Sequence, residues 1–161
     1  MNEQLKSNIK IEAIVSAAFN FFITGMIAAL IHHKADTVAT DLSVAIDLLL
    51  TCLSTGILTA LFSKASVRRA KTAGVIPAAS GIMRFLSRLF RHPVLFGLLV
   101  GAAAAVGFAI PTILIFMLPG IMSIPFGVYV PLKCLFGALL GGGFTALEIY
   151  AGMCKTDKNN E

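Results

Sequence analysis

Residues 63–93 read SKASVRRAKTAGVIPAASGIMRFLSRLFRHP, and this basic segment decides how the chain is organised. It holds seven of the thirteen Lys and Arg residues of the protein and no Asp or Glu. Short loops rich in Lys and Arg stay on the cytoplasmic side of a membrane. If the sequence on either side crosses a bilayer, the segment is predicted to be a cytoplasmic connection between two membrane-embedded halves.

The sequence on both sides of this segment is apolar enough to cross a bilayer. A spanning helix needs about 20 mostly apolar residues, because the hydrocarbon is about 30 Å thick and a helix rises about 1.5 Å per residue. Two such stretches precede the basic segment and two follow it: residues 11–31, 42–62, 94–118 and 127–150. The first is longer than the apolar core of a secretory signal, so we predict that it is retained as a span.

The overall composition excludes most soluble proteins. Of the 161 residues, 57% are hydrophobic and only 13% are charged, well below the roughly one quarter that is charged in soluble domains. The mean hydropathy of +0.88 also excludes intrinsic disorder. The net charge of +5 is concentrated in predicted cytoplasmic segments. We therefore attribute it to membrane topology and expect no nucleic-acid partner.

Four spans place both termini on the same side as the basic segment. Among the remaining basic residues, only Lys34 falls in a predicted outer connection. Four lysines near the termini agree with a cytoplasmic location: Lys6, Lys10, Lys155 and Lys158. The sequence thus predicts a multi-pass protein of the cell (inner) membrane with both termini cytoplasmic.

An internal duplication is predicted by a shift of 86 residues, which lays the second span on the fourth. Seven positions are then identical, among them Gly56 with Gly142. The halves would be parallel helical-hairpin repeats related by an axis along the membrane normal. We predict one membrane domain, residues 1–161, made of hairpin repeat 11–62, linker and interfacial helix 63–93, and hairpin repeat 94–150.

Small residues recur every four positions on the last two spans. Gly97 and Gly101 lie on the third span, and Gly137 and Gly141 on the fourth. Such stripes let helix backbones approach closely, which is a main source of attraction between helices in lipid. We expect the third and fourth spans to be each other's closest neighbours, although the stripes could also serve contacts between copies. Pro111 lies inside the third span, where it removes one backbone hydrogen bond and is expected to kink the helix.

Two ionisable residues lie inside predicted spans, where each is costly and is a candidate for function. They are Asp47 in the second span and Lys133 in the fourth, and the shift of 86 residues superposes them. They form a candidate intramembrane charge pair. Three interpretations stay open: a polar pocket in which the pair separates to admit a solute or proton, a static bridge, or two side chains that reach the interface independently.

Other polar residues of the spans are assigned lesser roles. Glu12 and Glu148 lie near the predicted cytoplasmic ends and are expected to be solvated at the interface. The alternative for Glu148 is an inward-facing position in a proton-coupled gate. Asn20 is a candidate for a hydrogen bond across the bundle, whereas Thr24 and Thr51 are expected to bond their own helices.

The second half of the basic segment predicts a short amphipathic helix, from Ser80 to before Pro93. Its apolar face holds Ile82, Phe85, Leu86, Leu89 and Phe90, and its cationic face holds Arg84, Arg88 and Arg91. Such a helix lies in the bilayer interface and contacts anionic lipid through its basic residues. The alternative is a cytoplasmic extension of the third span.

No motif of catalysis or cofactor binding is present. The chain lacks C-x-x-C, a phosphate loop and H-E-x-x-H, and His32 with Asp36 supplies only two metal ligands. We expect no enzyme, no cofactor and no metal site. The leading hypothesis is a small transporter or transport-associated protein that acts as an oligomer in the lipid bilayer. The alternative is a scaffold or accessory subunit bound to a larger membrane protein complex.

Overall fold

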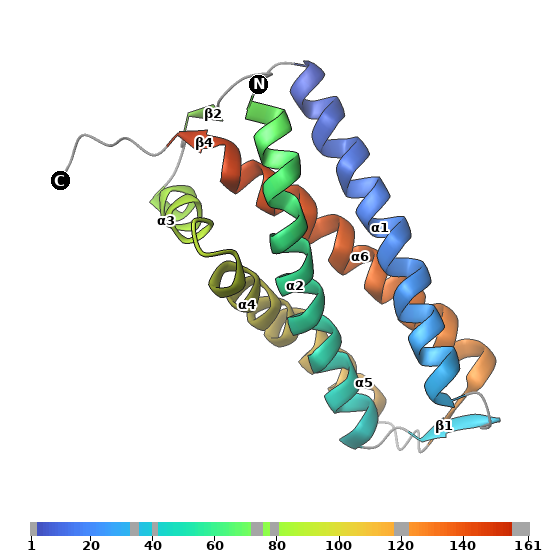
Figure 1. Cartoon of the computed structure of the whole chain (residues 1–161). Coiled ribbons are helices and arrows are strands. Elements are labelled where there is room, and N and C mark those ends of the chain that lie inside the picture. The colour runs from blue at the N-terminus through green and yellow to red at the C-terminus, as the bar shows by residue number, and fades with distance from the viewer. Residues whose placement is uncertain are drawn as a thin grey trace.

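The computed structural model of the chain is almost entirely helical (Figure 1). It describes residues 3–32, 36–39, 42–71, 76–77, 81–117 and 123–155. A π-helical turn, η1 (Ala105–Ala109), joins α4 to α5. The α-helices are α1 (Glu3–His32), α2 (Leu42–Lys71), α3 (Gly81–Leu89), α4 (Pro93–Ala104), α5 (Ile110–Met117) and α6 (Phe126–Met153).

Four helical segments are long and apolar enough to cross a membrane. They are Lys6–His32, Leu42–Arg69, Pro93–Ile115 and Phe126–Met153. The third comprises α4, η1 and most of α5. Each coincides with one predicted span, so the prediction of a helical chain with four helices able to span a membrane is confirmed. The helices extend beyond several predicted limits. The largest differences are the start of α1 at Glu3 and the end of α2, which continues past residue 62 into the basic segment.

Two short strands join the connections at one end of the bundle, called the strand end here. Strand β1 (Thr37–Ala39) pairs antiparallel with β3 (Ser123–Pro125). The side chains of Val38 and Ile124 are buried in this pair, and the Phe126 N–H donates to the Asp36 carbonyl at 3.0 Å. The hydropathy pattern did not predict this pairing. Residues 33–35, 40–41 and 118–122, with the predicted end of the third span, lie outside the described residues.

The opposite end, called the terminal end, holds the start of α1 and the end of α6 (Figure 1). Here β2 (Ile76–Pro77) pairs in parallel with β4 (Cys154–Lys155). Residues 72–75 and 78–80 of the predicted linker, and the terminus beyond residue 155, lie outside the described residues. An even number of long helices explains why the start of α1 and the end of α6 lie at the same end of the bundle.

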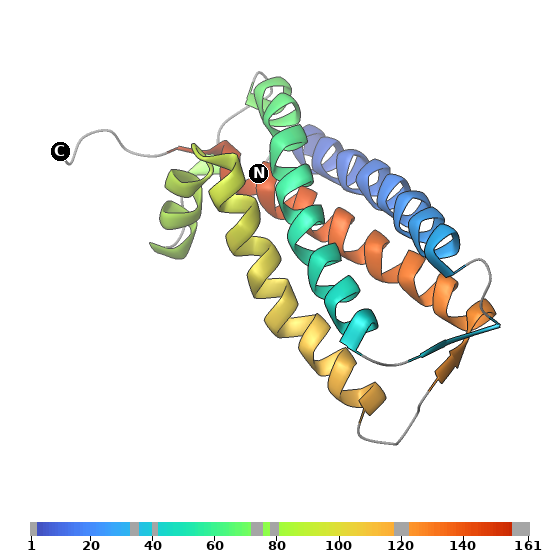
Figure 2. The same ribbon diagram turned by 60° about the horizontal axis from the view of Figure 1, so that its bottom comes forward.

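The long helices pack in the order α4, α2, α6, α1 (Figure 2). The prediction that the third and fourth spans are closest neighbours is therefore wrong. Gly97 and Gly101 instead press on α2: a Cβ at Gly101 would lie 2.8 Å from the carbonyl oxygen of Cys52. The glycine stripe predicted a close approach, but which helix approaches depends on how the helices are arranged.

The glycines of α6 make a similar approach to α1. A Cβ at Gly137 would lie 2.9 Å from the Cβ of Thr24, and one at Gly141 would lie 2.8 Å from the Cβ of Asn20. These contacts set α1 and α6 close together. The side of α1 that faces α6 is thereby fixed.

The third span departs from a regular α-helix just before Pro111. The N–H of Ile110 donates to the carbonyl of Ala105, five residues earlier rather than four. Pro111 has no N–H, and its ring crowds the preceding turn of a helix. A single π-helical turn accommodates this change while the span remains helical.

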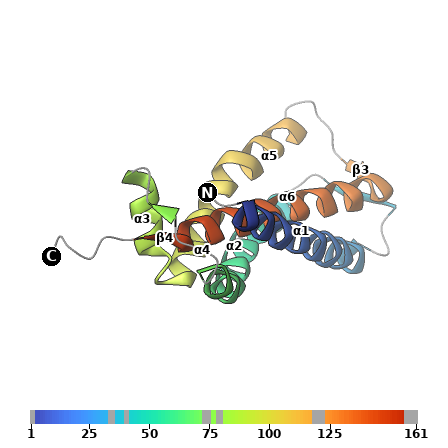
Figure 3. The same ribbon diagram turned by 90° about the horizontal axis from the view of Figure 1, so that it is seen from above.

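Helix α3 is separate from α4, so the alternative of one continuous extension of the third span is wrong. A turn at residues 90–92 ends α3, with the His92 N–H donating to the Leu89 carbonyl at 2.9 Å. Phe90 packs its ring edge-to-face with Phe96, with centroids 5.3 Å apart. Viewed from the terminal end, α3 lies to one side of the long helices, near β4 (Figure 3).

Candidate functional site

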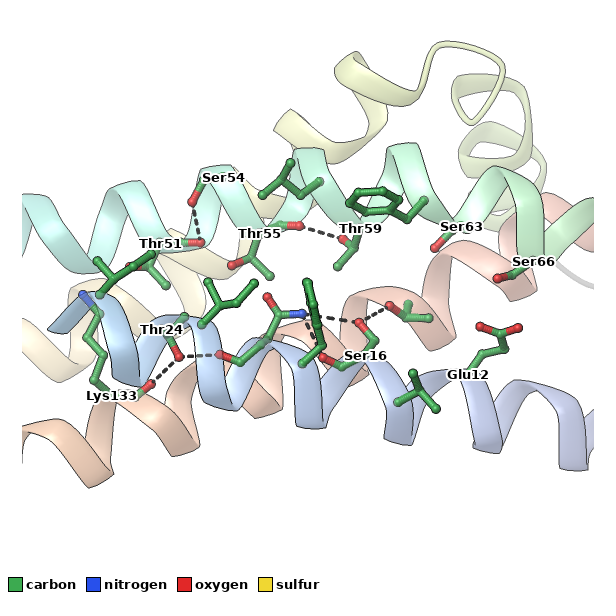
Figure 4. Close-up of a pocket in the computed structure, with 18 residues that line it drawn as sticks. Glu12, Ser16, Thr24, Thr51, Ser54, Thr55, Thr59, Ser63, Ser66 and Lys133 are labelled. Atoms are coloured by element: carbon green, nitrogen blue, oxygen red, sulfur yellow. Dashed lines mark hydrogen bonds between the residues drawn. The ribbon is translucent and has the colours of Figure 1, made fainter. Parts of the chain in front are cut away.

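A groove of about 470 Å³ lies between α1 and α2, with residues of α6 at its base. Figure 4 shows polar side chains from the three helices directed into it. Helices α1 and α2 make few contacts with each other, because both pack mainly on other helices. The groove is the space that this arrangement leaves between them.

A stripe of hydroxyl groups on α2 forms one wall of the groove. Thr51, Thr55, Thr59 and Ser63 follow one another at intervals of four residues, and all are buried. Residues spaced by four lie on the same face of a helix. Ser66, near the terminal end, continues the stripe and is also buried.

A second polar stripe, on α1, faces the first across the groove. Its members, Glu12, Ser16, Asn20 and Thr24, also recur every four residues. From α6, Thr145 and Lys133 complete the polar lining. The sequence contains both four-residue periods, and this spacing is the signal that could have located the groove. Without the fold it could not show that the two stripes meet.

Hydrogen bonds within the lining connect α1 to α6. The Thr145 hydroxyl donates to the Ser16 Oγ at 2.7 Å, and the Ser16 hydroxyl donates to the Gly141 carbonyl at 3.1 Å. Asn20 was a candidate for a hydrogen bond across the bundle, but its amide donates to the Ser16 carbonyl of its own helix at 2.9 Å. Gly141 has no Cβ to meet Asn20, so α1 lies close enough for Ser16 to reach the Gly141 carbonyl.

The threonines named in the sequence analysis bond their own helices. The Thr24 hydroxyl donates to the Asn20 carbonyl at 2.6 Å, and the Thr51 hydroxyl donates to the Asp47 carbonyl at 2.7 Å. Thr24 also approaches the Lys133 carbonyl of α6, at 3.3 Å. These bonds satisfy the hydroxyl protons, and the oxygen lone pairs remain available to a polar molecule in the groove.

At the strand end, the structure brings Asp47 and Lys133 together in an ion pair. The Lys133 side chain is 2% exposed and that of Asp47 is 25% exposed. The Tyr129 hydroxyl donates to Asp47 Oδ2 at 2.8 Å, and the ring of His32 packs edge-to-face on Tyr129. This geometry fits a pair better than two independently solvated charges.

Lys133 lies between two cavities. It lines the groove and also a smaller cavity of about 210 Å³ bounded by α2, α6 and Thr112 of α5. The smaller cavity is mostly apolar, with Val44, Leu48 and Leu139 among its lining residues. An ammonium group with one carboxylate partner has further hydrogens to donate. Lys133 is therefore positioned to bind a polar group that enters the groove.

Near the terminal end, Glu148 is fully buried against α2, and the prediction that it is solvated at the interface is wrong. Thr59 Oγ1 lies at hydrogen-bond distance from Glu148 Oε1, 2.8 Å, and the Ser63 hydroxyl donates to Oε2 at 2.7 Å. Over the described part of the chain, no Lys or Arg forms an ion pair with Glu148. The rotation of α6 about its axis, which hydropathy does not reveal, directs this carboxyl inward.

The remaining charged residues of interest lie at the surface. Glu12, at the mouth of the groove, is half-buried and pairs with Arg69 at 3.9 Å. Three arginines are exposed and do not line the groove: Arg84 and Arg88 on α3, and Arg91 in the turn that follows it. Comparisons of the chain with protein-family models, curated proteins and solved structures found no match. A functional assignment therefore depends on the chemistry of the groove.

Proposed function

We propose that the chain is a small membrane transporter, or a transport-associated protein, and that it acts as an oligomer. The polar groove is the observation that carries this proposal. From Thr51 to Ser66 its α2 wall extends about 22 Å at the rise of an α-helix, most of the roughly 30 Å of hydrocarbon. Polar residues inside a membrane are costly and mark solute or ion pathways.

The chemistry of the lining favours a small polar or zwitterionic solute. Hydroxyls and one amide occupy the walls, a cation lies toward the strand end, and Glu12 lies at the other mouth. A solute of this class can exchange hydrogen bonds with the hydroxyl stripes as it moves. The walls also contain apolar side chains. These would limit the affinity of the groove for the solute and so permit its release.

Oligomerisation is proposed because the groove is open on one side. The rim residues Phe19, Leu58 and Phe62 are well exposed. Four helices alone leave this side open to lipid, whereas a second copy placed against the rim would close the pathway. The groove would then be lined on all sides by protein.

The arrangement of two parallel hairpin repeats is part of this proposal. A twofold axis along the membrane normal would exchange α1 with the third span and α2 with α6. The α1–α6 and α2–α4 contacts would then be equivalent, with the α2–α6 contact on the axis, as the packing order suggests. Asp47 and Lys133 occupy equivalent positions at that central contact. The terminal end, which carries the basic residues, would face the cytoplasm of a cell with this protein in its inner membrane.

Helix α3 is proposed to lie in the cytoplasmic interface of the bilayer. Ile82 and Phe85 are exposed although they are apolar, and the basic side chains of Arg84 and Arg88 lie beside them. Leu86 packs against the core and holds the helix to the bundle. This combination fits burial of apolar side chains at the level of the headgroups, with anionic lipid near the arginines.

The alternative function is an accessory subunit or scaffold, in which a helix of a larger membrane complex fills the groove. The exposed apolar rim favours this possibility, because a transmembrane helix would cover Phe19 and Phe62. The two functions differ in when the groove is filled. A partner helix fills it in native membranes, whereas a transport pathway stays accessible to water there.

Thiol accessibility tests the proposed pathway. Single cysteines are placed at Thr55 and Ser66 in a background where the native Cys52, Cys134 and Cys154 are replaced by Ala, and a membrane-impermeant thiol reagent is applied to native membranes. We expect both positions to react. The lipid-facing control Phe22→Cys, at a position 71% exposed in the structure, should not react because lipid excludes the reagent.

The outcomes separate the two functions. Reaction at Thr55→Cys in native membranes supports an aqueous pathway. Reaction only after purification and reconstitution supports the accessory alternative, because the partner has been removed. No reaction in either preparation overturns the pathway. Where Thr55→Cys reacts, loss of solute entry into proteoliposomes after labelling would tie the groove to transport.

A further inference from the structure

We propose that Glu148, together with Thr59 and Ser63, is a proton-binding site beside the groove, and that its carboxyl carries a proton in the described conformation. The coupling of this proton to solute movement rests on the proposed transport function. The protonation itself does not, and it can be tested alone.

The count of hydroxyl hydrogens leads to this proposal. Thr59 Oγ1 has one hydrogen but lies 2.8 Å from both the Thr55 carbonyl oxygen and Glu148 Oε1. A carbonyl and a carboxylate both accept only, so one hydrogen cannot serve both contacts fully. If Glu148 is protonated, its Oε1–H donates to Thr59 Oγ1, and the Thr59 hydroxyl donates to Thr55.

The second carboxyl oxygen fits the same assignment. Ser63 Oγ lies 2.7 Å from Glu148 Oε2 and donates to it. The neutral acid then has one donated and one accepted hydrogen bond, and every polar atom of the cluster is satisfied. A carboxylate in the same place would be fully buried, and its Oε1 would share the Thr59 hydrogen with the Thr55 carbonyl. A charge solvated so incompletely is costly in a membrane interior.

The charged groups on the surrounding elements do not compensate a carboxylate at this position. Helices α1, α2 and α3 all contact α6. On α1 and α2, Glu12 and Arg69 face each other. The arginines of α3 are exposed. At the other end of the groove, Lys133 is paired with Asp47.

The groove gives the proton a route. Thr59 and Ser63 line the groove, and Glu148 lies behind them. When the acid releases its proton to water in the groove, the negative charge stays on the carboxyl group. The Thr59 hydroxyl must then turn away from Thr55 toward that charge, and water must enter to solvate it. Proton release would therefore loosen the α2–α6 contact at the terminal end.

Infrared difference spectroscopy of the reconstituted protein tests the proposal. A protonated carboxylic acid has a carbonyl stretch that a carboxylate lacks. We expect such a band at neutral pH, its loss as the pH is raised, and its absence in Glu148→Gln. The matched control Glu12→Gln should keep the band, because Glu12 is half-buried and ion-paired.

A second variant keeps the test decisive if Glu148→Gln does not fold. Thr59→Val removes the acceptor of the carboxyl hydrogen and should shift the frequency of the band. Thr51 belongs to the same hydroxyl stripe, but its hydroxyl donates to the Asp47 carbonyl. Thr51→Val should therefore leave the frequency of the band unchanged. Absence of a protonated-acid band at neutral pH, or a band unaffected by both Glu148→Gln and Thr59→Val, overturns the proton site. The result does not depend on thiol accessibility, so either proposal can fail alone.

Discussion

Asp47 and Lys133 lie 86 residues apart in the sequence and form an ion pair where α2 crosses α6. The Tyr129 hydroxyl, one turn before Lys133, donates to the same carboxylate at 2.8 Å. The pair lies at the strand-end limit of the groove, and Lys133 lines it. The ion pair joins α2 to α6 near the strand end and places the Lys133 ammonium beside the groove.

Breaking this pair should be strongly destabilising. In Asp47→Asn the Lys133 ammonium stays buried without a counter-charge, so we expect a loss of about 3 to 5 kcal/mol in the free energy of unfolding. Thermal unfolding followed by circular dichroism in detergent measures the loss. Asp36→Asn is the control, because Asp36 is exposed near the same end of the bundle, and it should unfold like the original protein.

Exchanging the two charges distinguishes the possible roles of the pair. The double variant Asp47→Lys with Lys133→Asp restores a charge pair and should recover most of the lost free energy of unfolding. A loss of about 1 kcal/mol should remain, because the hydrogen bond from Tyr129 to Asp47 is not restored. Recovery of stability without recovery of transport indicates a working pocket, and recovery of both indicates a static bridge. If the double variant is no more stable than Asp47→Asn, the pair does not determine stability.

Replacing a glycine of α4 that faces α2 by a larger residue should lower the free energy of unfolding. In Gly97→Ala the new Cβ would lie 2.6 Å from the Cα of Ile57 and close to the carbonyl of Gly56. The backbones of α2 and α4 would have to separate, at a cost of about 1 to 3 kcal/mol. Gly143→Ala is the matched control, because nothing lies within 4 Å of its new Cβ. It should be neutral or up to about 1 kcal/mol more stable; equal effects in the two variants would contradict the described α2–α4 contact.

The position of α3 can be measured with a single tryptophan, since the chain has none. Phe85→Trp should be quenched most by lipids brominated near the headgroup. Phe22→Trp, at an exposed site within α1, should be quenched most by lipids brominated deep in the acyl chain. Replacing Arg84, Arg88 and Arg91 by Gln should remove any preference of the Phe85→Trp signal for anionic lipid. Emission typical of water at Phe85→Trp would place α3 outside the interface.

The orientation of the chain can be tested with the same cysteine-free background. Arg84→Cys and Lys155→Cys should react with an impermeant thiol reagent from the cytoplasmic side. Thr37→Cys, in the exposed part of β1, should react only from the opposite side. The terminal end then faces the cytoplasm, as the positive charge of residues 63–93 predicts. Reaction of Arg84→Cys and Lys155→Cys from different sides would rule out four spans with both termini cytoplasmic.

The number and approximate limits of the long helices could be predicted because bilayer thickness sets the length of an apolar stretch. The predicted span 127–150, for example, lies within α6. Helix boundaries were less predictable. α2 runs on to Lys71, because a helix that leaves the membrane needs no apolar side chains to continue. The β1–β3 pair was missed because three-residue strands carry too little periodicity to detect.

The sequence left an inward position of Glu148 as an alternative to solvation but could not decide between them, and it did not predict that the two polar stripes meet. In lipid, the face of a helix that contacts another helix and the face that contacts acyl chains are both apolar, so hydropathy does not fix rotation. The spacing of Thr51, Thr55, Thr59 and Ser63 showed that they share a face of α2. It did not show that this face is opposite α1.

By itself, the amino-acid sequence determined that four helices are able to cross a membrane, because the cost of burying polar groups in hydrocarbon acts on each segment separately. It also singled out Asp47 and Lys133, the two charges that such a segment should exclude. Only the tertiary structure decided that Gly97 contacts α2 rather than α6, that Glu148 is buried, and that a groove remains between α1 and α2. Those features depend on the rotation and order of the helices, which are set by contacts between side chains far apart in the sequence.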